Sequence, residues 1–210
     1  MFLIDFILHI GDYIGNFIEL YGAFTYAILF LVIFIETGLV IMPFLPGDSL
    51  IFAAGAFVAL GQLNYFWVYI LLIIAAVAGD NINYLIGKKI GQKIIESKKV
   101  KYLNEKNLNK AHDLINKHGA KAVLLARFMP IIRTIVPFIA GMGEMDHKRF
   151  TVYNFIGGII WVTLFINLGY FFGNTEVVQE NFTLIILAII AISLLPIAIE
   201  IIRNMIKSKK

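Results

Sequence analysis

Cysteine is absent from the 210-residue chain, which excludes disulfides, thiol nucleophiles and zinc–thiolate sites. Charge is also scarce, because only 15% of the residues are Asp, Glu, Lys or Arg whereas 60% are hydrophobic. A soluble domain has about 25% charged residues. The composition therefore predicts an integral membrane protein.

Lys and Arg are missing altogether from residues 1–87. A secretory signal peptide begins with a basic segment, so this start does not predict a cleaved leader. The basic residues gather in the ten-lysine segment 88–121, at Lys148 and Arg149, and after residue 202. By the positive-inside rule these segments face the cytosol. We therefore expect a bacterial cytoplasmic membrane protein with both termini inside, and we read the net charge of +4 as topology and not as a nucleic-acid interface.

Motifs of enzymes are lacking as well. The chain has no G-x-S-x-G, no H-E-x-x-H and no phosphate-binding loop. His112 and His118 lie in the lysine-rich segment without carboxylates at metal-ligand spacing. The sequence predicts no enzyme, no metal site and no cofactor.

The apolar runs predict one all-α polytopic membrane domain over residues 1–210. Segments 42–63 and 122–144 carry proline and glycine within apolar sequence, which predicts re-entrant helical hairpins. A full crossing by residues 122–144 would place the later basic segments outside, so the positive-inside rule favours the re-entrant form. The other expected elements are an interfacial amphipathic helix at 2–19, membrane-spanning helices at 23–41, 66–87, 150–172 and 182–202, and a cytosolic basic loop at 88–121.

A weak internal repeat relates two parts of the chain. Residues 42–87 and 129–173 both begin with Met-Pro, continue through an alanine–glycine cluster and an apolar span, and end in Y-x-x-G. Many transporters carry two such halves in inverted orientation, with broken helices that meet near the bilayer midplane. This pattern predicts two opposed hairpins in an inverted-repeat fold.

Four charged residues lie within this apolar sequence: Glu36, Asp48, Arg127 and Arg133. An arginine at the centre of a membrane helix costs about 2.5–3.5 kcal/mol, so each arginine needs an acidic partner. A pair of planar guanidinium groups suits a phosphate better than lysine does. We expect the arginines to bind a lipid phosphate, and the carboxylates to pair with them or to take up protons.

The path of the chain decides whether the arginines can meet. Arg127 and Arg133 are six residues apart and would lie on different faces of a continuous helix. Pro130 and Pro137 are expected to break this stretch and to let the two side chains converge. Two of the charged groups also have simpler explanations: Asp48 suits a helix N-cap, and neutralisation of a buried arginine alone would account for Glu36.

Asp80 and Asn154 are secondary candidates. Asp80 is close to Lys88, which favours an interfacial capping or pairing role. Asn154 and Trp161 lie on a glycine-rich span, where packing is the simpler interpretation.

Three motifs in order carry a family resemblance: E-T-G-x-x-x-x-P-F-L-P-G-D-S-L, R-F-x-P-x-x-R-T-x-x-P-F-x-A-G-M-G-x-M and F-x-x-Y-N-x-x-G-x-x-x-W. Over about residues 20–175 the chain resembles the DedA family, the bacterial branch of the VTT (SNARE-associated Golgi protein) membrane proteins. The resemblance implies two opposed re-entrant hairpins and lipid translocation, either of undecaprenyl phosphate or of phospholipids. It also implies that Glu36 and Asp48 match the family's acidic pair, that Arg127 and Arg133 match its essential arginines, and that protons drive some members.

Three classes of function remain open at this stage. The first is a translocase of a phosphate-bearing lipid, with membrane lipid and protons as its partners. The second is a proton-coupled antiporter of cations or osmolytes, in which the acidic pair binds the cation. The third is an assembly factor that transports nothing. The sequence leaves the lipid, the driving ion and homo-oligomer formation undecided.

Overall fold

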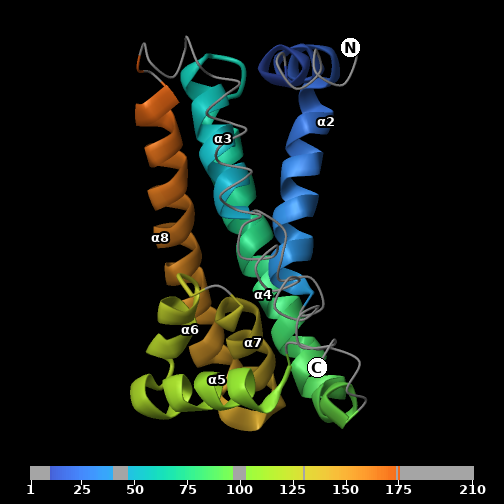
Figure 1. Cartoon of the computed structure of the whole chain (residues 1–210), viewed down its shortest axis with the longest axis vertical. Helices are drawn as coiled ribbons and strands as arrows, with labels where there is room; N and C mark the ends of the chain where they lie inside the picture. The colour runs from blue at the N-terminus through green and yellow to red at the C-terminus, as the bar shows by residue number, and fades with distance from the viewer. Residues whose placement is uncertain (1–9, 40–46, 97–102, 130, 174, 176–210) are drawn as a thin grey trace, which may run out of the picture. The chain divides into compact units, whose positions relative to one another are not determined.

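The structure, a computed structural model, describes residues 10–39, 47–96, 103–129, 131–173 and 175. These residues are helical throughout apart from short turns, and they contain no strand (Figure 1). The elements are α2 (Ile10–Gly38), α3 (Gly47–Ala59), α4 (Tyr65–Glu96), α5 (Glu105–His118), α6 (Lys121–Ala126), α7 (Ile132–Ile139), the π-helix η1 (Ala140–Glu144) and α8 (His147–Gly173).

Three helices are long and apolar enough to cross a membrane. The spans are Tyr21–Gly38 within α2, Tyr65–Glu96 and His147–Gly173. A kink at Gly22 separates the first span from the earlier part of α2. The prediction of an all-helical membrane fold is thereby confirmed. Of the interfacial helix expected at 2–19, residues 10–19 belong to α2 and residues 2–9 lie outside the described residues, as does the span expected at 182–202. The re-entrant hairpins remain a prediction.

Contacts between residues divide the chain into two compact units. Unit 1 comprises residues 1–28, 46–68 and 164–210, and unit 2 comprises residues 29–45 and 69–163. The long helices α2, α4 and α8 each contribute to both units.

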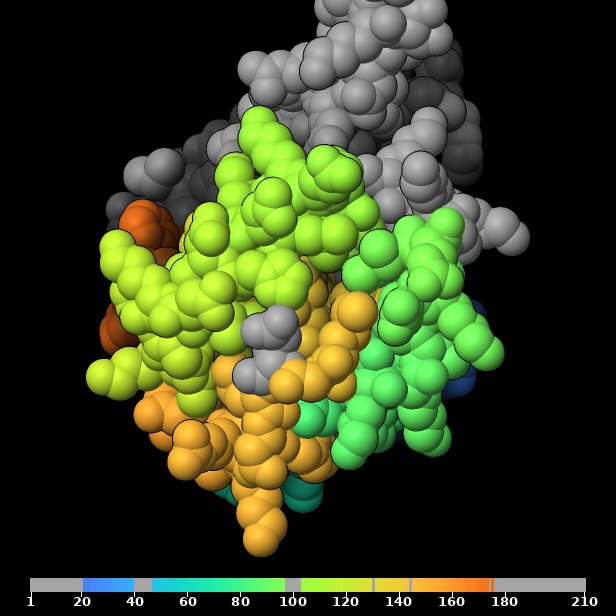
Figure 2. Space-filling model, turned by 90° about the horizontal axis from the view of Figure 1, so that it is seen from below, coloured from blue at the N-terminus to red at the C-terminus, as the bar shows by residue number. Residues whose placement is uncertain are grey.

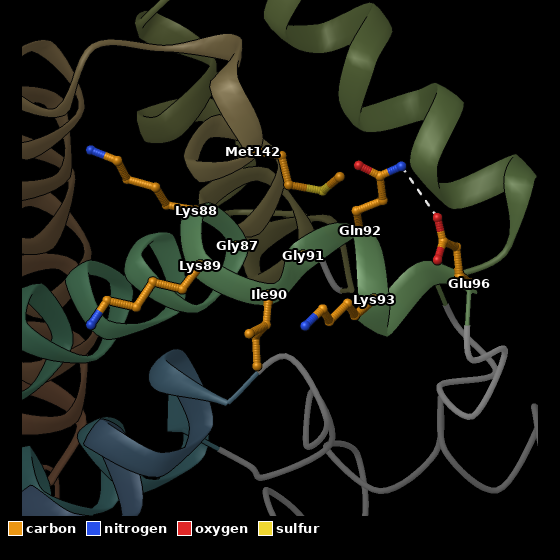
Figure 3. Close-up of a pocket in the computed structure, with 9 residues that line it drawn as sticks. All are labelled: Gly87, Lys88, Lys89, Ile90, Gly91, Gln92, Lys93, Glu96 and Met142. Carbon is orange, nitrogen blue, oxygen red and sulfur yellow. Dashed lines mark hydrogen bonds between the residues drawn. The ribbon is translucent and has the colours of Figure 1, made fainter.

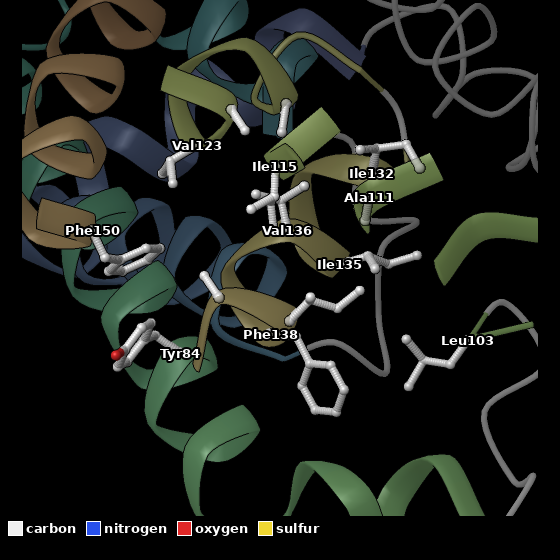
Figure 4. Close-up of a cluster of buried hydrophobic side chains, with 14 residues drawn as sticks. Tyr84, Leu103, Ala111, Ile115, Val123, Ile132, Ile135, Val136, Phe138 and Phe150 are labelled. Carbon is white, nitrogen blue, oxygen red and sulfur yellow. The ribbon is translucent and has the colours of Figure 1, made fainter. Parts of the chain in front are cut away.

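The core of unit 2 is a cluster of buried apolar side chains in which α5 packs against α7 (Figure 4). Ala111 and Ile115 form the buried face of α5, and Ile135 and Val136 come from α7. The opposite face of α5 is exposed and lies at the surface beside the start of α8 (Figure 2). The amphipathic helix α5 thus fixes α7, the helix that carries Arg133.

Glycines allow α7 and η1 to lie directly against α4 in unit 2. A Cβ atom at Gly141 would come 2.8 Å from the carbonyl carbon of Tyr84 and 3.0 Å from the amide nitrogen of Lys88. A Cβ atom at Gly87 would come 2.8 Å from the carbonyl carbon of Phe138. The backbones therefore touch at two points, and neither position has room for a side chain.

Unit 1 contains the same arrangement between α3 and α8. A Cβ atom at Gly55 would come 3.0 Å from the amide nitrogen of Tyr170, and one at Gly169 would come 2.8 Å from the carbonyl carbon of Phe52. Phe52 and Gly55 precede their counterparts Phe138 and Gly141 by 86 residues. On the long helices, however, Gly87 precedes Gly169 by 82 residues, so these contacts match the alanine–glycine clusters of the repeat but not its Y-x-x-G ends. The repeat and the inverted orientation of its halves stay predictions.

The close contact of η1 with α4 yields a prediction about stability. We expect Gly141→Ala to lower the unfolding temperature clearly, because the added methyl group meets the backbone of α4, which cannot move aside. Gly91→Ala is the matched control, since its methyl group would meet no backbone but the flexible side chain of Met142 and, at 3.5 Å, the ring of Phe138. Thermal unfolding of both variants in detergent tests this, and equal unfolding temperatures would contradict the close backbone contact.

The sequence predicted that Pro130 and Pro137 break the second segment, and the helices are interrupted between Ala126 and Ile132. The prediction for Pro137 is wrong, because Pro137 lies inside α7 and the helical path continues through Ile139 into η1. Pro137 is the sixth residue of α7, where a proline removes a single intrahelical hydrogen bond. Pro130 lies outside the described residues. Its neighbour Ile131, just before α7, has a φ of 70°, which is strained for a β-branched residue.

Candidate functional site

Arg127 lies at the end of α6 and inserts between α4 and α8 in unit 2. Its Nη2 atom donates to Asp80 Oδ2 on α4 and to Asn154 Oδ1 on α8. Asn154 is oriented in turn, because its Nδ2 atom donates to the carbonyl of Val77 at 3.0 Å. Arg127 is only 5% exposed, so this ion pair is buried. Asp80 is therefore the partner of Arg127 and does not act as an interfacial partner of Lys88.

Arg127 lies against two glycines of α8, at distances that correspond to ordinary van der Waals contact. A Cβ atom at Gly157 of α8 would come 3.4 Å from Arg127 Nε, and one at Gly158 would come 3.9 Å from Nη2. The guanidinium thus lies along the backbone of α8, held by two acceptors from two long helices.

Arg133 forms a second ion pair, with Glu36 at the end of α2. Its Nη2 atom donates to Glu36 Oε1. The Glu36 side chain has no exposed surface, and its Oε2 atom is buried without a hydrogen-bond partner. A carboxylate this deeply buried needs the guanidinium for compensation of its charge.

Trp161 of α8 connects the two ion pairs. The guanidinium carbons of Arg127 and Arg133 lie 5.6 Å and 5.7 Å from the centre of its ring. A buried tryptophan stabilises such cations by about 2 kcal/mol or more. The sequence assigned Trp161 to packing, and the structure adds this contact with both arginines.

A small cavity of about 10 Å³ lies among these groups, lined by Thr37, Asp80, Val123, Arg127, Arg133, Thr134 and Trp161. It has room for about one water molecule. The Nε and Nη1 atoms of Arg127 are buried without hydrogen-bond partners. Arg127 therefore has hydrogen-bond donors that the observed contacts do not use.

The chain matches the VTT domain family over residues 45–171. It is 50% identical to protein DedA of Escherichia coli K12 over 205 residues, which cover 97% of this chain and 94% of that protein. The chain belongs to the DedA family. Inner membrane protein YqjA of Escherichia coli K12 is a further relative, 36% identical over 72% of this chain and 69% of its own length. No solved structure matches the chain.

Membership in the DedA family of membrane proteins agrees with the three apolar spans. Asp48, the remaining acidic candidate, is the second residue of α3 and is half-buried in unit 1. An acidic residue in the first turn stabilises a helix N-terminus. The structure thus brings Glu36, Arg127 and Arg133 together in unit 2, with Asp48 in the other unit.

A larger cavity of about 440 Å³ lies at the end of α4, where lysines line it together with Met142 of η1. Figure 3 shows Lys88 and Lys89 extending to one side, while Gln92 and Glu96 lie on the other and share a hydrogen bond of 3.2 Å. All these polar side chains are exposed and do not converge on one point. The described residues also contain no group of three His, Asp or Glu that could hold a metal ion. The buried pairs remain the better candidate site of this DedA-family chain.

Proposed function

We propose that this protein is a lipid translocase that moves a phosphate-bearing lipid, undecaprenyl phosphate or a phospholipid, across the cytoplasmic membrane of a bacterium. The observation that carries the proposal is a pair of buried guanidinium groups, 5.6 Å and 5.7 Å from one tryptophan ring, inside an apolar helical unit. Buried charges in membrane segments mark substrate or ion pathways. Two arginines that share one cavity suit an anion with several oxygens, such as a phosphate monoester.

The proposal treats the observed arrangement as the closed state. A cavity of about 10 Å³ cannot admit a phosphate group. The phosphate therefore replaces Glu36 as the partner of Arg133, and the displaced carboxylate takes up a proton or moves to water. Arg127 keeps its two acceptors on Nη2 and offers its unpaired Nε and Nη1 donors to the same phosphate. Departure of the lipid lets Glu36 return.

The proposed path uses two re-entrant hairpins, one around α3 and one around α7 and η1. The equal glycine contacts of the two short helices support this view. In the proposal Asp48 is the charged group of the first hairpin, as the arginines are the charged groups of the second. The protein acts by binding and charge exchange, without a cofactor and without covalent chemistry.

Loss of Arg133 should abolish transport without loss of insertion. Arg133→Ala removes the group that both Glu36 and the lipid phosphate bind, so we expect flip of undecaprenyl phosphate to fall to the rate of protein-free vesicles. Arg149→Ala is the matched control, because Arg149 is an exposed arginine at the start of α8. The measurement is flip in reconstituted vesicles with an imposed pH gradient, with phosphatidylethanolamine as the second lipid.

Transport by Arg133→Ala at the wild-type rate would overturn the proposal. Flip of neither lipid by the wild type, together with proton flux stimulated by a monovalent cation, would instead favour an antiporter. The buried Oε2 atom of Glu36, which lacks a hydrogen-bond partner, would then be the cation ligand.

A further inference from the structure

Asn83 of α4 joins two chain segments through a single amide group. Its Nδ2 atom donates to the carbonyl of Thr37 at 3.2 Å and to the carbonyl of Thr134 at 2.8 Å. The side chain has no exposed surface. The amide nitrogen carries two hydrogens, and both are used. A flipped amide would place its oxygen against two carbonyl oxygens, so these partners fix its orientation.

The two carbonyls belong to the residues that directly follow Glu36 and Arg133. Thr37 lies in the last turn of α2, where carbonyl groups lack partners within the helix. Asn83 supplies that missing donor and connects the same point to α7. The backbone segments that carry the two members of the ion pair are thus fixed to one amide.

A second contact anchors the end of α2 one helical turn away. A Cβ atom at Gly38 would come 3.3 Å from the Cα atom of Gly79, four residues before Asn83 on α4. The end of α2 therefore rests against α4 at two successive turns. Only the Asn83 contact also reaches α7.

The unused atom of Asn83 shows which part of the amide matters. Its Oδ1 atom is buried and has no hydrogen-bond partner. An unsatisfied buried acceptor is costly, so an apolar side chain would be the simpler choice for packing alone. The two donated hydrogen bonds are what the amide provides here.

We propose that Asn83 is a positioning residue that holds Glu36 and Arg133 at pairing distance, so that Glu36 can compete with the lipid phosphate for the guanidinium. This inference rests on the proposed function. It adds that Asn83 determines how strongly Glu36 competes with the phosphate for Arg133. The Asn83 amide hydrogen-bonds to the two carbonyls and not to the Glu36 or Arg133 side chains. It acts through the backbone on both sides of the ion pair.

The proposal predicts opposite changes in binding and in transport for Asn83→Ala. Loss of the clamp weakens the Glu36–Arg133 pair, so undecaprenyl phosphate should bind more tightly, with a dissociation constant about tenfold lower. Flip should become slower, because Glu36 no longer displaces the bound phosphate efficiently. General damage to the fold would weaken binding and slow flip together.

The experiment measures binding and flip of undecaprenyl phosphate by the full chain in vesicles. Asn83→Ser keeps one hydroxyl donor and should give an intermediate shift, and it decides the question if Asn83→Ala fails to fold. Gln92→Ser is the control, because Gln92 is an exposed residue of α4 whose amide donates to Glu96 at 3.2 Å. Introduced into the wild type, Glu36→Gln should lower the dissociation constant. Introduced into the Asn83→Ala variant, it should have little further effect, because the effects of coupled residues on binding are not additive.

A second readout needs no lipid. The chain has two tryptophans, so Trp67→Phe leaves Trp161, beside Arg133, as the reporter. Asn83→Ala should shift the Trp161 emission in the same direction as Glu36→Gln, and Gln92→Ser should leave it unchanged. If wild-type protein binds no phosphate lipid, the proposed function fails, yet this emission still tests the clamp. An emission that responds to Glu36→Gln but not to Asn83→Ala, or additive effects on binding, would overturn the role of Asn83.

Discussion

Asp80→Ala should destabilise the folded protein by about 3–5 kcal/mol, the usual cost of removing one partner from a buried ion pair. The variant leaves Arg127, which is 5% exposed, with Asn154 as its remaining acceptor on Nη2. The free energy of unfolding in mixed detergent micelles measures this loss. Asp146→Ala is the control: Asp146 is an exposed aspartate whose carboxylate accepts from the amides of Lys148 and Arg149 at the start of α8. A helix cap of this kind contributes about 1 kcal/mol.

A double variant separates stability from function at the same pair. Asp80→Leu with Arg127→Met replaces both charges with apolar groups, which often restores the stability that a single charge removal destroys. We expect a stable protein that does not flip undecaprenyl phosphate, because one of the two phosphate-binding guanidiniums is missing. An Asp80→Ala protein as stable as Asp146→Ala would contradict the buried ion pair.

Trp161→Leu should lower the free energy of unfolding by about 3 kcal/mol, the lower end of the roughly 3–5 kcal/mol found when a buried Phe or Trp is truncated to alanine, because leucine fills part of the space. Trp161 is 1% exposed, and its ring faces both guanidiniums. The smaller side chain leaves a cavity and removes the cation–π contact of both arginines at once. Trp161→Phe should cost less, because it keeps an aromatic face.

Trp67 provides the comparison for the tryptophan prediction. It is 62% exposed, so Trp67→Leu should leave the unfolding free energy nearly unchanged. Binding of undecaprenyl phosphate should weaken in Trp161→Leu and stay normal in Trp67→Leu. Equal unfolding free energies for the two leucine variants would show that the ring of Trp161 does not stabilise the arginines.

The hydropathy of the sequence was sufficient to predict the long helices. The spans expected at 66–87 and 150–172 lie within α4 and α8, because about 20 consecutive apolar residues leave few alternatives in a membrane. The path near the arginines was harder to predict. Pro137 is accommodated inside α7, and the wide turn of η1 depends on the fit of Gly141 against α4, which no local pattern encodes.

The charged residues of the site were predictable, but their pairing was only partly so. Burial of Arg127 and Arg133 requires acidic partners, and this reasoning correctly singled out Glu36. Asp80 was assigned to Lys88 because the two are near in sequence. Eight residues of helix place them about 12 Å apart along the axis, too far for an ion pair. Two arginines within apolar sequence need two acidic partners, and Asp80 is an acidic residue within an apolar span, so it could have been predicted as the partner of an arginine.

Asn83 gave almost no signal in the sequence. An asparagine within an apolar span indicates a hydrogen-bonding role, yet its partners here are two backbone carbonyls, and every residue has one. Only the packing of α2, α4 and α7 selects Thr37 and Thr134. Contacts to backbone are set by tertiary structure, so this part of the site could not be read from residue types.

The most direct test of the central claim is a binding titration with two ligands that differ only in the phosphate. Purified protein would be titrated with undecaprenyl phosphate and with undecaprenol, for the wild type and for Arg127→Lys/Arg133→Lys. The account predicts that the wild type strongly prefers the phosphate and that the lysine variant loses this preference, because an ammonium group cannot reproduce the planar fork of a guanidinium. Equal binding of both ligands by the wild type, or a preference that survives both substitutions, would contradict a phosphate site at the arginines.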